Sequence, residues 1–384
     1  MSWSGEVAIV GAYESPRRKA PGVHPFEIQA ECVFGALEDA GLEPADVDGF
    51  CTAAGFPGEG GAWMDVCEVA EWLGIHPTFA DSTDIGGAAP ISHAGHAAAA
   101  IATGMAEVVV VSYAACSYSG AADFDTPPPG WGPFGYEAPY GFTTVASYAL
   151  AAQRHMHEFG TTPEQLAQIA VQCRANAAGN PDARYRDPLT IEDVLASPVV
   201  ASPLHRNDCC VVTDSGGAVV LTGKSRAASC RKKPVWLLGF GEALGQMQMS
   251  QMWPYTETVA RVSGPRALAM AGVAHDDVDC AQIYDSFTIT VLITLESLGF
   301  CGKGEGGPFV ESGALAPGGA LPINTDGGGL SSNHPGRRGV FTLIEGVRQL
   351  RGEGPGVQLA DPRVVLCHGT GGSLSATATM ILGV

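Results

Sequence analysis

The chain has 384 residues, of which 46% are hydrophobic and 16% are charged, so it is long enough for two domains and a large buried core. Its net charge of −19 argues against nucleic acids and anionic membranes as partners, because both bind through clustered Lys and Arg. No apolar run reaches the roughly 18 residues of a membrane span. The 11 cysteines form no regular framework and no signal peptide precedes them, which favours the reducing cytoplasm.

The first part of the chain is predicted to alternate strands and helices. Val7–Val10 is a continuous apolar run, as expected of a strand covered on both faces. A helix is expected from Pro25 to Ala40, with Gly41 at its C-cap. The further elements expected before residue 120 are strand Asp48–Thr52, helix Val66–Leu73, a strand from Phe79, helix Ala88–Thr103 and strand Val108–Ser112. The glycine turn Asp84–Gly87, ahead of the Ala-rich helix, is the first place to look for function.

The segment 120–145 is too long and irregular for a simple connector and is predicted to form a lid or substrate loop. The elements expected after it are helices Ala146–Phe159, Thr162–Ala178 and Thr190–Ala196 and strands Cys210–Thr213 and Gly217–Leu221. A linker around Gly223–Pro234 then ends the first half.

The second half is predicted to repeat this scheme around a glycine-rich excursion, Cys301–Asn324. Its expected elements are strand Val235–Gly239, helix Gly264–Ala271, strand Ala281–Tyr284, helix Thr288–Leu298, helix Val340–Arg351, strand Arg363–Cys367, turn His368–Gly372 and strand Thr377–Leu382.

The repeat is also visible in the residues themselves. An apolar strand that ends in glycine, Val7–Gly11, is followed by Ala-Leu-Glu-Asp-Ala-Gly and an Asp-Val-Asp that ends at Asp48. At nearly the same spacing, Val235–Gly239 is followed by Ala-Leu-Ala-Met-Ala-Gly and an Asp-Val-Asp that ends at Asp279. The chain is therefore predicted to be a duplicated α/β protein. Residues 1–228 form its first half, with a loop insertion around 120–200, and residues 229–384 its second half. An active site is expected where the halves meet.

Four motifs follow one another in the second half. They are Ala281-Gln-Ile-Tyr284-Asp285-Ser-Phe287, Gly302–Val310, Gly328–Gly336 with His334, and Val365–Gly372 with His368. In order and separation they resemble motifs of the thiolase superfamily, in its sterol-carrier-protein thiolase branch, and the resemblance covers nearly the whole chain. It implies a duplicated thiolase fold with two mixed β-sheets in a layered αβαβα arrangement.

One departure from the thiolases changes the expected chemistry. Thiolases need a cysteine nucleophile at the N-terminus of the buried central helix, where the helix lowers its pKa. Here that turn contains Asp84, Ile85 and Gly87 and no cysteine. The turn instead resembles that of the lipid-transfer-protein-like aldolases of the superfamily, which cleave steroid side chains.

This resemblance implies retro-aldol cleavage of a β-hydroxyacyl-CoA to a ketone and a short acyl-CoA. Such a reaction needs a base for the β-hydroxyl proton and donors for the enolate on the thioester oxygen. We expect Tyr284 and His334 to share the acid–base work and His368 to orient or stabilise the thioester enolate. Each of these side chains could instead be structural, and Asp285 is expected to bond the turn backbone. The aldolases are expected to have a second tyrosine near the His334 position, so the substrate is left open.

No metal or redox cofactor is expected, and CoA enters only as part of the substrate. His93 and His96 lie three residues apart on the Ala-rich helix, but without a third ligand they are predicted to be buried packing. The resemblance implies a homodimer and a separate OB-fold partner protein.

Two alternatives remain open. One is an acyltransferase or condensing enzyme that uses another cysteine, with Cys116, Cys301 and Cys367 as candidates, although each is more typical of a small buried residue. The other is a non-catalytic thiolase-like scaffold or lipid-binding subunit.

Overall fold

The computed structural model of the protein describes residues 3–53, 64–120, 137–141 and 143–384. Most of the predicted lid at 120–145 lies outside these described residues. The elements of the first half are β1 (Val7–Glu14), α1 (Pro25–Ala40), β2 (Gly49–Thr52), α2 (Asp65–Leu73), β3 (Phe79–Asp81), α3 (Ala89–Ala102), β4 (Val108–Cys116), α5 (Thr144–Phe159), α6 (Pro163–Ala177), α7 (Ile191–Ala196), β5 (Val199–Ala201), β6 (Leu204–His205), β7 (Asp214–Gly223) and α8 (Lys224–Ala227).

The second half repeats this succession of strands and helices. Its elements are β8 (Val235–Leu244), α9 (Ala260–Ala271), β9 (Cys280–Ile283), α10 (Thr288–Leu298), α11 (Gly306–Glu311), a π-helical turn (Gly328–Ser332), α12 (Gly339–Arg351), β10 (Val364–Gly371) and β11 (Ala376–Gly383). The predicted boundary at residue 228 falls between α8 and β8 and stays a prediction.

The order of the strands reveals the duplication. The described strands form a nine-stranded mixed sheet in the order β3-β2-β4-β7-β1-β8-β11-β10-β9, besides the small β5–β6 hairpin. Outward from the centre, β1-β7-β4-β2 on one side mirrors β8-β11-β10-β9 on the other. The centre is a short antiparallel contact in which Ala8 pairs with Trp236 and Ile9 with Val235. The two predicted sheets are therefore the two halves of one continuous sheet.

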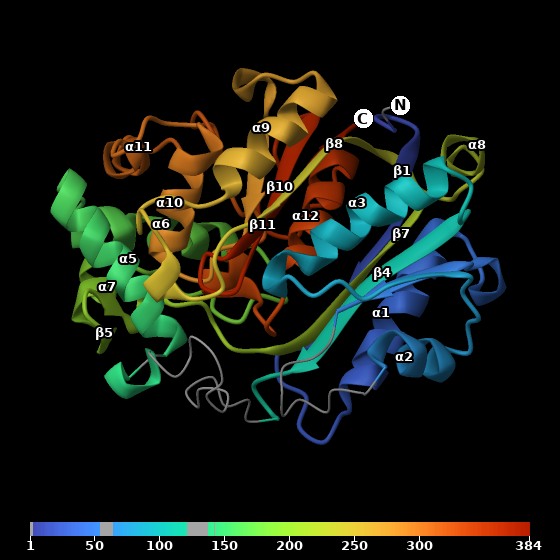
Figure 1. The fold of residues 1–384 in the computed structure, drawn as a ribbon, viewed down its shortest axis with the longest axis horizontal. Helices are drawn as coiled ribbons and strands as arrows, with labels where there is room; N and C mark the ends of the chain where they lie inside the picture. The colour runs from blue at the N-terminus through green and yellow to red at the C-terminus, as the bar shows by residue number, and fades with distance from the viewer. Residues whose placement is uncertain (1–2, 54–63, 121–136, 142) are drawn as a thin grey trace.

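Three hydrophobic clusters fill the spaces between the layers. One lies between α1 and α2 and the outer face of the first half-sheet. The second surrounds α3 and α12, and it draws strand residues from both half-sheets. The third lies on the outer side of the second half-sheet, with α9 and α10 and with α5 and α6 of the first half. In Figure 1, α1 and α2 lie at one end of the molecule, α5–α7, α10 and α11 at the other, and α3 between them. This is the predicted αβαβα layering.

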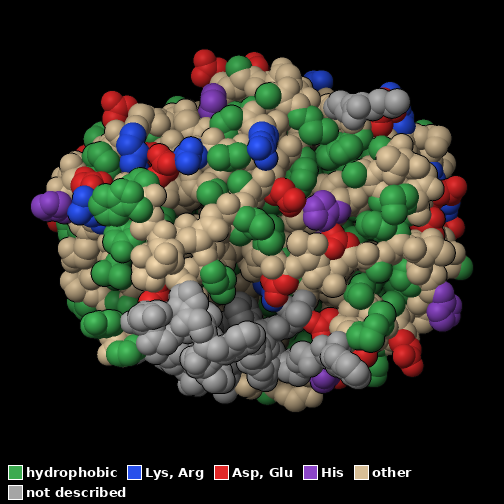
Figure 2. Space-filling view, viewed as in Figure 1, with side chains coloured by type: hydrophobic (Ala, Val, Ile, Leu, Met, Phe, Trp, Pro, Cys, Tyr) green, Lys and Arg blue, Asp and Glu red, His purple; other side chains and the backbone are tan. Residues whose placement is uncertain are grey.

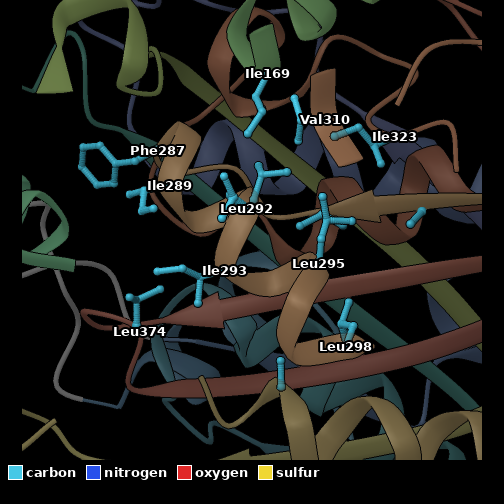
Figure 3. Packing of buried hydrophobic residues seen from close by; sticks show 14 of the residues in the cluster. Ile169, Phe287, Ile289, Leu292, Ile293, Leu295, Leu298, Val310, Ile323 and Leu374 are labelled. Carbon is cyan, nitrogen blue, oxygen red and sulfur yellow. The ribbon is translucent and has the colours of Figure 1, made fainter. Parts of the chain in front are cut away.

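Helix α10 shows why the third cluster forms. All eleven of its residues are buried, so it is covered on every side. Figure 3 shows Leu292 and Leu295 directed toward Val310 and Ile323 of the neighbouring segments, while Leu374 lies on the side of Ile293. A helix that is buried on every side is stable only inside such a cluster.

Two of the predicted elements differ from the structure. The strand expected at Cys210–Thr213 is wrong: β7 is a single strand that begins at Asp214. The preceding residues cross the molecule instead, and their backbone amides bond the carbonyls of Ser286 and Gly329. The turn expected at His368–Gly372 is also wrong, because β10 pairs with β11 as far as Gly371.

The surface reflects the acidic composition. Figure 2 shows acidic side chains scattered over the visible face rather than gathered in one patch. Across the described ranges, each helix is too short or too polar to cross a lipid bilayer.

Candidate active site

The N-terminal turn of α3 is the base of the candidate site. Gly86 adopts a left-handed φ of +64°, and its amide donates to Asp84 Oδ1 at 2.9 Å. A Cβ atom on Gly87 would lie only 2.3 Å from Cε2 of Tyr284. The glycine therefore lets the tyrosine ring rest directly on the start of the buried helix, in the turn that contains no cysteine.

The start of α12 reaches the same point from the other half. A Cβ atom on Gly339, the first residue of α12, would lie 2.4 Å from the carbonyl oxygen of Gly87. The N-termini of two buried helices thus meet beside Tyr284. Because a helix N-terminus carries a partial positive charge, this point favours negative charge.

Tyr284 and His334 are in direct contact. The Tyr284 hydroxyl lies 2.9 Å from His334 Nε2 and 2.6 Å from the Gly336 carbonyl oxygen. A carbonyl can only accept, so the single phenolic proton is directed to Gly336 and His334 donates its Nε2 proton to the phenol oxygen. The tyrosine ring is buried, whereas the imidazole is partly exposed.

Both groups are neutral at neutral pH. Burial raises the pKa of the Tyr284 phenol well above its ordinary value. Burial, together with the nearby Arg338 guanidinium, lowers the pKa of His334 to about 4. A neutral imidazole beside a protonated phenol can accept a proton and pass one on, which general acid–base catalysis requires.

A buried charge network holds the loop that carries His334. Asp285, the residue after Tyr284, accepts the amides of Gly329 at 2.6 Å and Leu330 at 3.1 Å. Arg338 lies 3.3 Å from Asp285 and bonds both carboxylate oxygens of Asp326. The expectation that Asp285 bonds backbone is confirmed, and this bond fixes the Tyr284 strand end against the His334 loop.

Thr213 secures the same loop from the first half. Its hydroxyl donates to Asn333 Oδ1 at 2.7 Å and accepts the amide of His334 at 3.0 Å. The Asn333 side-chain amide in turn donates to Glu14 on β1 at 2.9 Å. Residues from both halves therefore set the position of His334.

His368 lies elsewhere. It is fully buried on β10, and its Nδ1 lies 2.9 Å from the Thr379 hydroxyl, which also contacts Ser263 of α9. The neighbouring Cys367 faces α12 and donates to the Thr342 carbonyl. Because successive side chains of a strand point to opposite faces, the His368 ring is on the α9 side of the sheet. Only its backbone carbonyl reaches the site, where it accepts the amide of Tyr284 at 2.9 Å.

Comparison with known proteins identifies the family. Residues 241–384 match the model described as "Thiolase C-terminal domain-like". Over 99% of its length the chain is 36% identical to all of the "17-hydroxy-3-oxo-4-pregnene-20-carboxyl-CoA lyase" of Mycobacterium tuberculosis. It is 34% identical, again over 99% of its length, to 98% of the "Steroid side-chain-cleaving aldolase" of Thermomonospora curvata. The chain belongs to the thiolase superfamily, in the branch of the steroid side-chain-cleaving aldolases.

A solved structure of this branch supports the same assignment. The structure named "Ltp2-ChsH2(DUF35) aldolase" superimposes with a TM-score of 0.90 at 33% identity, covering 99% of this chain and 98% of that one. The predicted thiolase fold is thereby confirmed.

The candidate cysteines of this superfamily member do not have the environment of a nucleophile. A thiolate nucleophile needs a lowered pKa. Burial instead raises the pKa of Cys301 to about 12 and that of Cys367 well above its ordinary value. The Cys116 thiol donates to the carbonyl of Val23, on the side of α1. An acyltransferase that uses one of these cysteines is not favoured.

The two histidines of α3 have different surroundings. His93 is fully buried and bonds the Thr83 carbonyl, as expected of a packing residue. The expectation of buried packing is wrong for His96, because the carboxylates of Asp81 at 2.6 Å and Glu242 at 3.4 Å hold its ring near the surface. Within the described part of the chain, no group of three His, Cys, Asp or Glu side chains is placed to hold a metal ion.

Sequence reasoning named the turn with Asp84 but missed the ion pair that Asp84 forms with Arg337. Arg337 bonds both carboxylate oxygens of Asp84, with Nη1–Oδ1 at 2.5 Å and Nη2–Oδ2 at 3.1 Å. This ion pair ties the α3 turn to the His334 loop. The sequence offered only their positions as a signal for this ion pair, since Asp84 directly precedes Ile85 and Arg337 directly follows Gly336.

Proposed function

We propose that the protein is a retro-aldolase that cleaves a β-hydroxyacyl-CoA with a bulky, steroid-like β-substituent to a ketone and a short acyl-CoA. The observation that carries the proposal is the Tyr284–His334 hydrogen bond at 2.9 Å, placed beside the turn before α3, which contains Asp84 and Ile85 and no cysteine. The similarity over 99% of the chain to two proteins named as a steroid carboxyl-CoA lyase and a steroid side-chain-cleaving aldolase supports the substrate class.

The reaction requires a proton to leave the substrate and another to return. The Tyr284–His334 pair takes the proton of the β-hydroxyl group as the carbon–carbon bond breaks and the ketone forms. The electron pair of that bond moves to the thioester as an enolate, which the meeting N-termini of α3 and α12 stabilise. The pair then returns a proton to the enolate carbon, which gives the shortened acyl-CoA.

We assign His368 a supporting role in this reaction rather than a contact with the substrate. Its carbonyl fixes the amide of Tyr284, and its ring is held by Thr379 on the α9 side. The cleavage is redox-neutral and its proton transfers use side chains already in the site. We therefore propose that CoA is needed only as part of the substrate.

We further propose a homodimer and a separate OB-fold partner. β3 lies at the edge of the described sheet, and an edge strand offers unpaired backbone groups to a second copy. The name of the similar aldolase structure joins Ltp2 with ChsH2(DUF35), which supports a second kind of chain. We also propose a reducing compartment such as the cytoplasm, since the 11 cysteines are free thiols.

The test is a product analysis. The protein, alone and with a candidate OB-fold partner, is incubated with a β-hydroxyacyl-CoA that bears a steroid ring system, and the products are followed by mass spectrometry. We expect a ring ketone and acetyl- or propionyl-CoA in equal amounts. Acyl transfer to a cysteine or to free CoA would overturn the proposal in favour of a thiolase. Absence of any turnover with the partner present would favour a non-catalytic subunit.

A further inference from the structure

Arg337 is a buried cation in the wall of the candidate site. It directly follows Gly336, whose carbonyl accepts the Tyr284 hydroxyl at 2.6 Å. Only 4% of its side chain is exposed, and its guanidinium carbon lies 5.9 Å from the centre of the Tyr113 ring. Its partner Asp84 lies three residues before Gly87, which packs against the Tyr284 ring, so both residues of the ion pair belong to segments that contact Tyr284. A fixed positive charge therefore lies close to the proposed proton carrier.

Asp84 holds this cation from the opposite half. It makes the two-point contact described above, and its other close partner is the amide of Gly86. About half of the Asp84 side chain is exposed, whereas that of Arg337 is buried. Water screens the exposed carboxylate more than the buried guanidinium, so the buried side of the pair keeps a net positive potential.

Among the described residues, the other ionisable side chains close to Tyr284 are uncharged near pH 7. They are the imidazole of His334, the thiol of Cys210, and the phenols of Tyr148 on α5 and Tyr113 on β4. Burial raises the pKa of Cys210 well above its ordinary value and that of Tyr148 to about 12.

The second cation in this region, Arg338, is balanced separately. The carboxylates of Asp285 and Asp326 lie within 3.3 Å of it, and all three side chains are buried. Arg337 and Asp84 form a separate charged pair, on segments that contact Tyr284.

We propose that Arg337 is a positioning residue that sets the protonation of Tyr284, and that Asp84 holds it and moderates its charge. The proposal deepens the function proposed above and rests on it. When the phenol passes its proton on, negative charge develops on its oxygen, and a preorganised cation lowers the free energy of that anion. The same cation favours the enolate that forms beside the phenol.

A purely mechanical role of the ion pair makes a different prediction. The pair joins segments 253 residues apart and so fastens the α3 turn to the His334 loop. If fastening were its only role, removing either charge would have the same consequence, because either change breaks the same contact. The electrostatic role predicts opposite consequences. Asp84→Asn removes a negative charge beside the cation, whereas Arg337→Gln removes the cation and keeps the carboxylate.

The experiment measures the phenol directly and needs no substrate. Tyrosine 284 is replaced in the full chain by 3,5-difluorotyrosine, whose more acidic phenol titrates in an accessible range. Its ionisation is then followed by 19F NMR in the wild-type, Asp84→Asn, Arg337→Gln and Arg337→Lys backgrounds. We expect Asp84→Asn to lower the pKa of this phenol by about one unit and Arg337→Gln to raise it by about one unit. Arg337→Lys keeps the charge and is expected to leave it nearly unchanged.

The matched control is Asp46→Asn, which breaks a surface ion pair between Asp46 and Arg226 (2.6 Å). This change is expected to leave the pKa of the phenol unchanged. Shifts of the same sign in Asp84→Asn and Arg337→Gln, or no shift in either, would overturn the proposal. If Arg337→Gln does not fold, the sign in Asp84→Asn decides alone, since a raised or unchanged pKa contradicts it. If the pKa shifts are as expected but the protein cleaves no acyl-CoA, the proposed function is rejected. The electrostatic coupling of Arg337 and Asp84 to the Tyr284 phenol would then still be established.

Discussion

At the scale of single residues, Tyr284 and His334 form one hydrogen-bonded unit, because the imidazole donates to the phenol oxygen and the phenol donates to Gly336, and we propose that this unit transfers the protons of the reaction. Tyr284→Phe removes the phenolic hydroxyl group. His334→Ala removes the imidazole that contacts this hydroxyl group. Each change is expected to lower kcat of the cleavage by at least ~100-fold. Steady-state assays of both variants, with thermal unfolding to confirm folding, make the measurement.

Tyr13→Phe is the control for this pair, because Tyr13 lies on β1 against Gly35 of α1 and has no contact with His334. It is expected to retain wild-type turnover. Full activity in Tyr284→Phe or in His334→Ala would remove that residue from the mechanism.

The sequence could nominate this pair but not its surroundings. Tyr284 and His334 belong to ordered motifs, so a family resemblance reaches them, and the fold brings them to 2.9 Å. His368 belongs to such a motif too, yet its ring faces α9, because the glycines after it continue the strand instead of turning. Asp84 and Arg337 are 253 positions apart, and no local pattern links an aspartate to an arginine at that distance.

At the scale of elements, the close approach of α3 and β10 to Tyr284 depends on Gly87. A Cβ atom there would lie 2.3 Å from the Tyr284 ring and 2.6 Å from the Thr370 carbonyl, so the ring or the strand must move. We expect Gly87→Ala to destabilise the protein by about 1–3 kcal/mol and to lower kcat at least tenfold. Urea unfolding and turnover of the same preparation test this.

Gly223→Ala is the matched control. Gly223 ends β7 with a φ of −74°, and its added Cβ would meet Ile101 at an ordinary 3.4 Å. Wild-type stability and turnover are expected there. If Gly87→Ala and Gly223→Ala had the same stability and turnover, the close contact at Gly87 would not be needed for folding or catalysis.

Element bounds were predictable where local signals act alone. Pro25 at the start and Gly41 at the end define α1 at the predicted residues. The strand predicted from Gly217 begins three residues earlier, at Asp214, and therefore includes Gly216 and Gly217. In the fold these glycines admit Ala114 and Ile344 at close range, and the strand passes through them. The glycines are therefore explained by tertiary contacts, which cannot be read from the local sequence.

At the scale of the whole molecule, buried histidines link stability to pH. Burial lowers the pKa of His368 to about 3 and that of His93 to about 4, against about 6.5 in the unfolded chain. Between pH 6.5 and these values the unfolded chain binds more protons than the folded one. Stability is therefore expected to fall as the pH decreases from about 6.5 toward 4.

The variant His368→Asn tests this link, because an asparagine amide can reach Thr379 but does not titrate. Urea unfolding at several pH values is expected to show a shallower loss of stability in the variant than in the wild type. An unchanged slope would mean that His368 does not contribute to the acid sensitivity.

The meeting of the two turns at Asp84 and Arg337 also bears on how the protein evolved. A duplicated gene begins as two identical copies, and identical turns facing each other would bring like charges together. Opposite charges at these two turns are a product of divergence, in which each copy specialised against the other. Neither copy could then drift alone, because a new charge in one turn is tolerated only when the other turn compensates. The symmetry between the two halves is therefore broken at these facing turns, beside the candidate site.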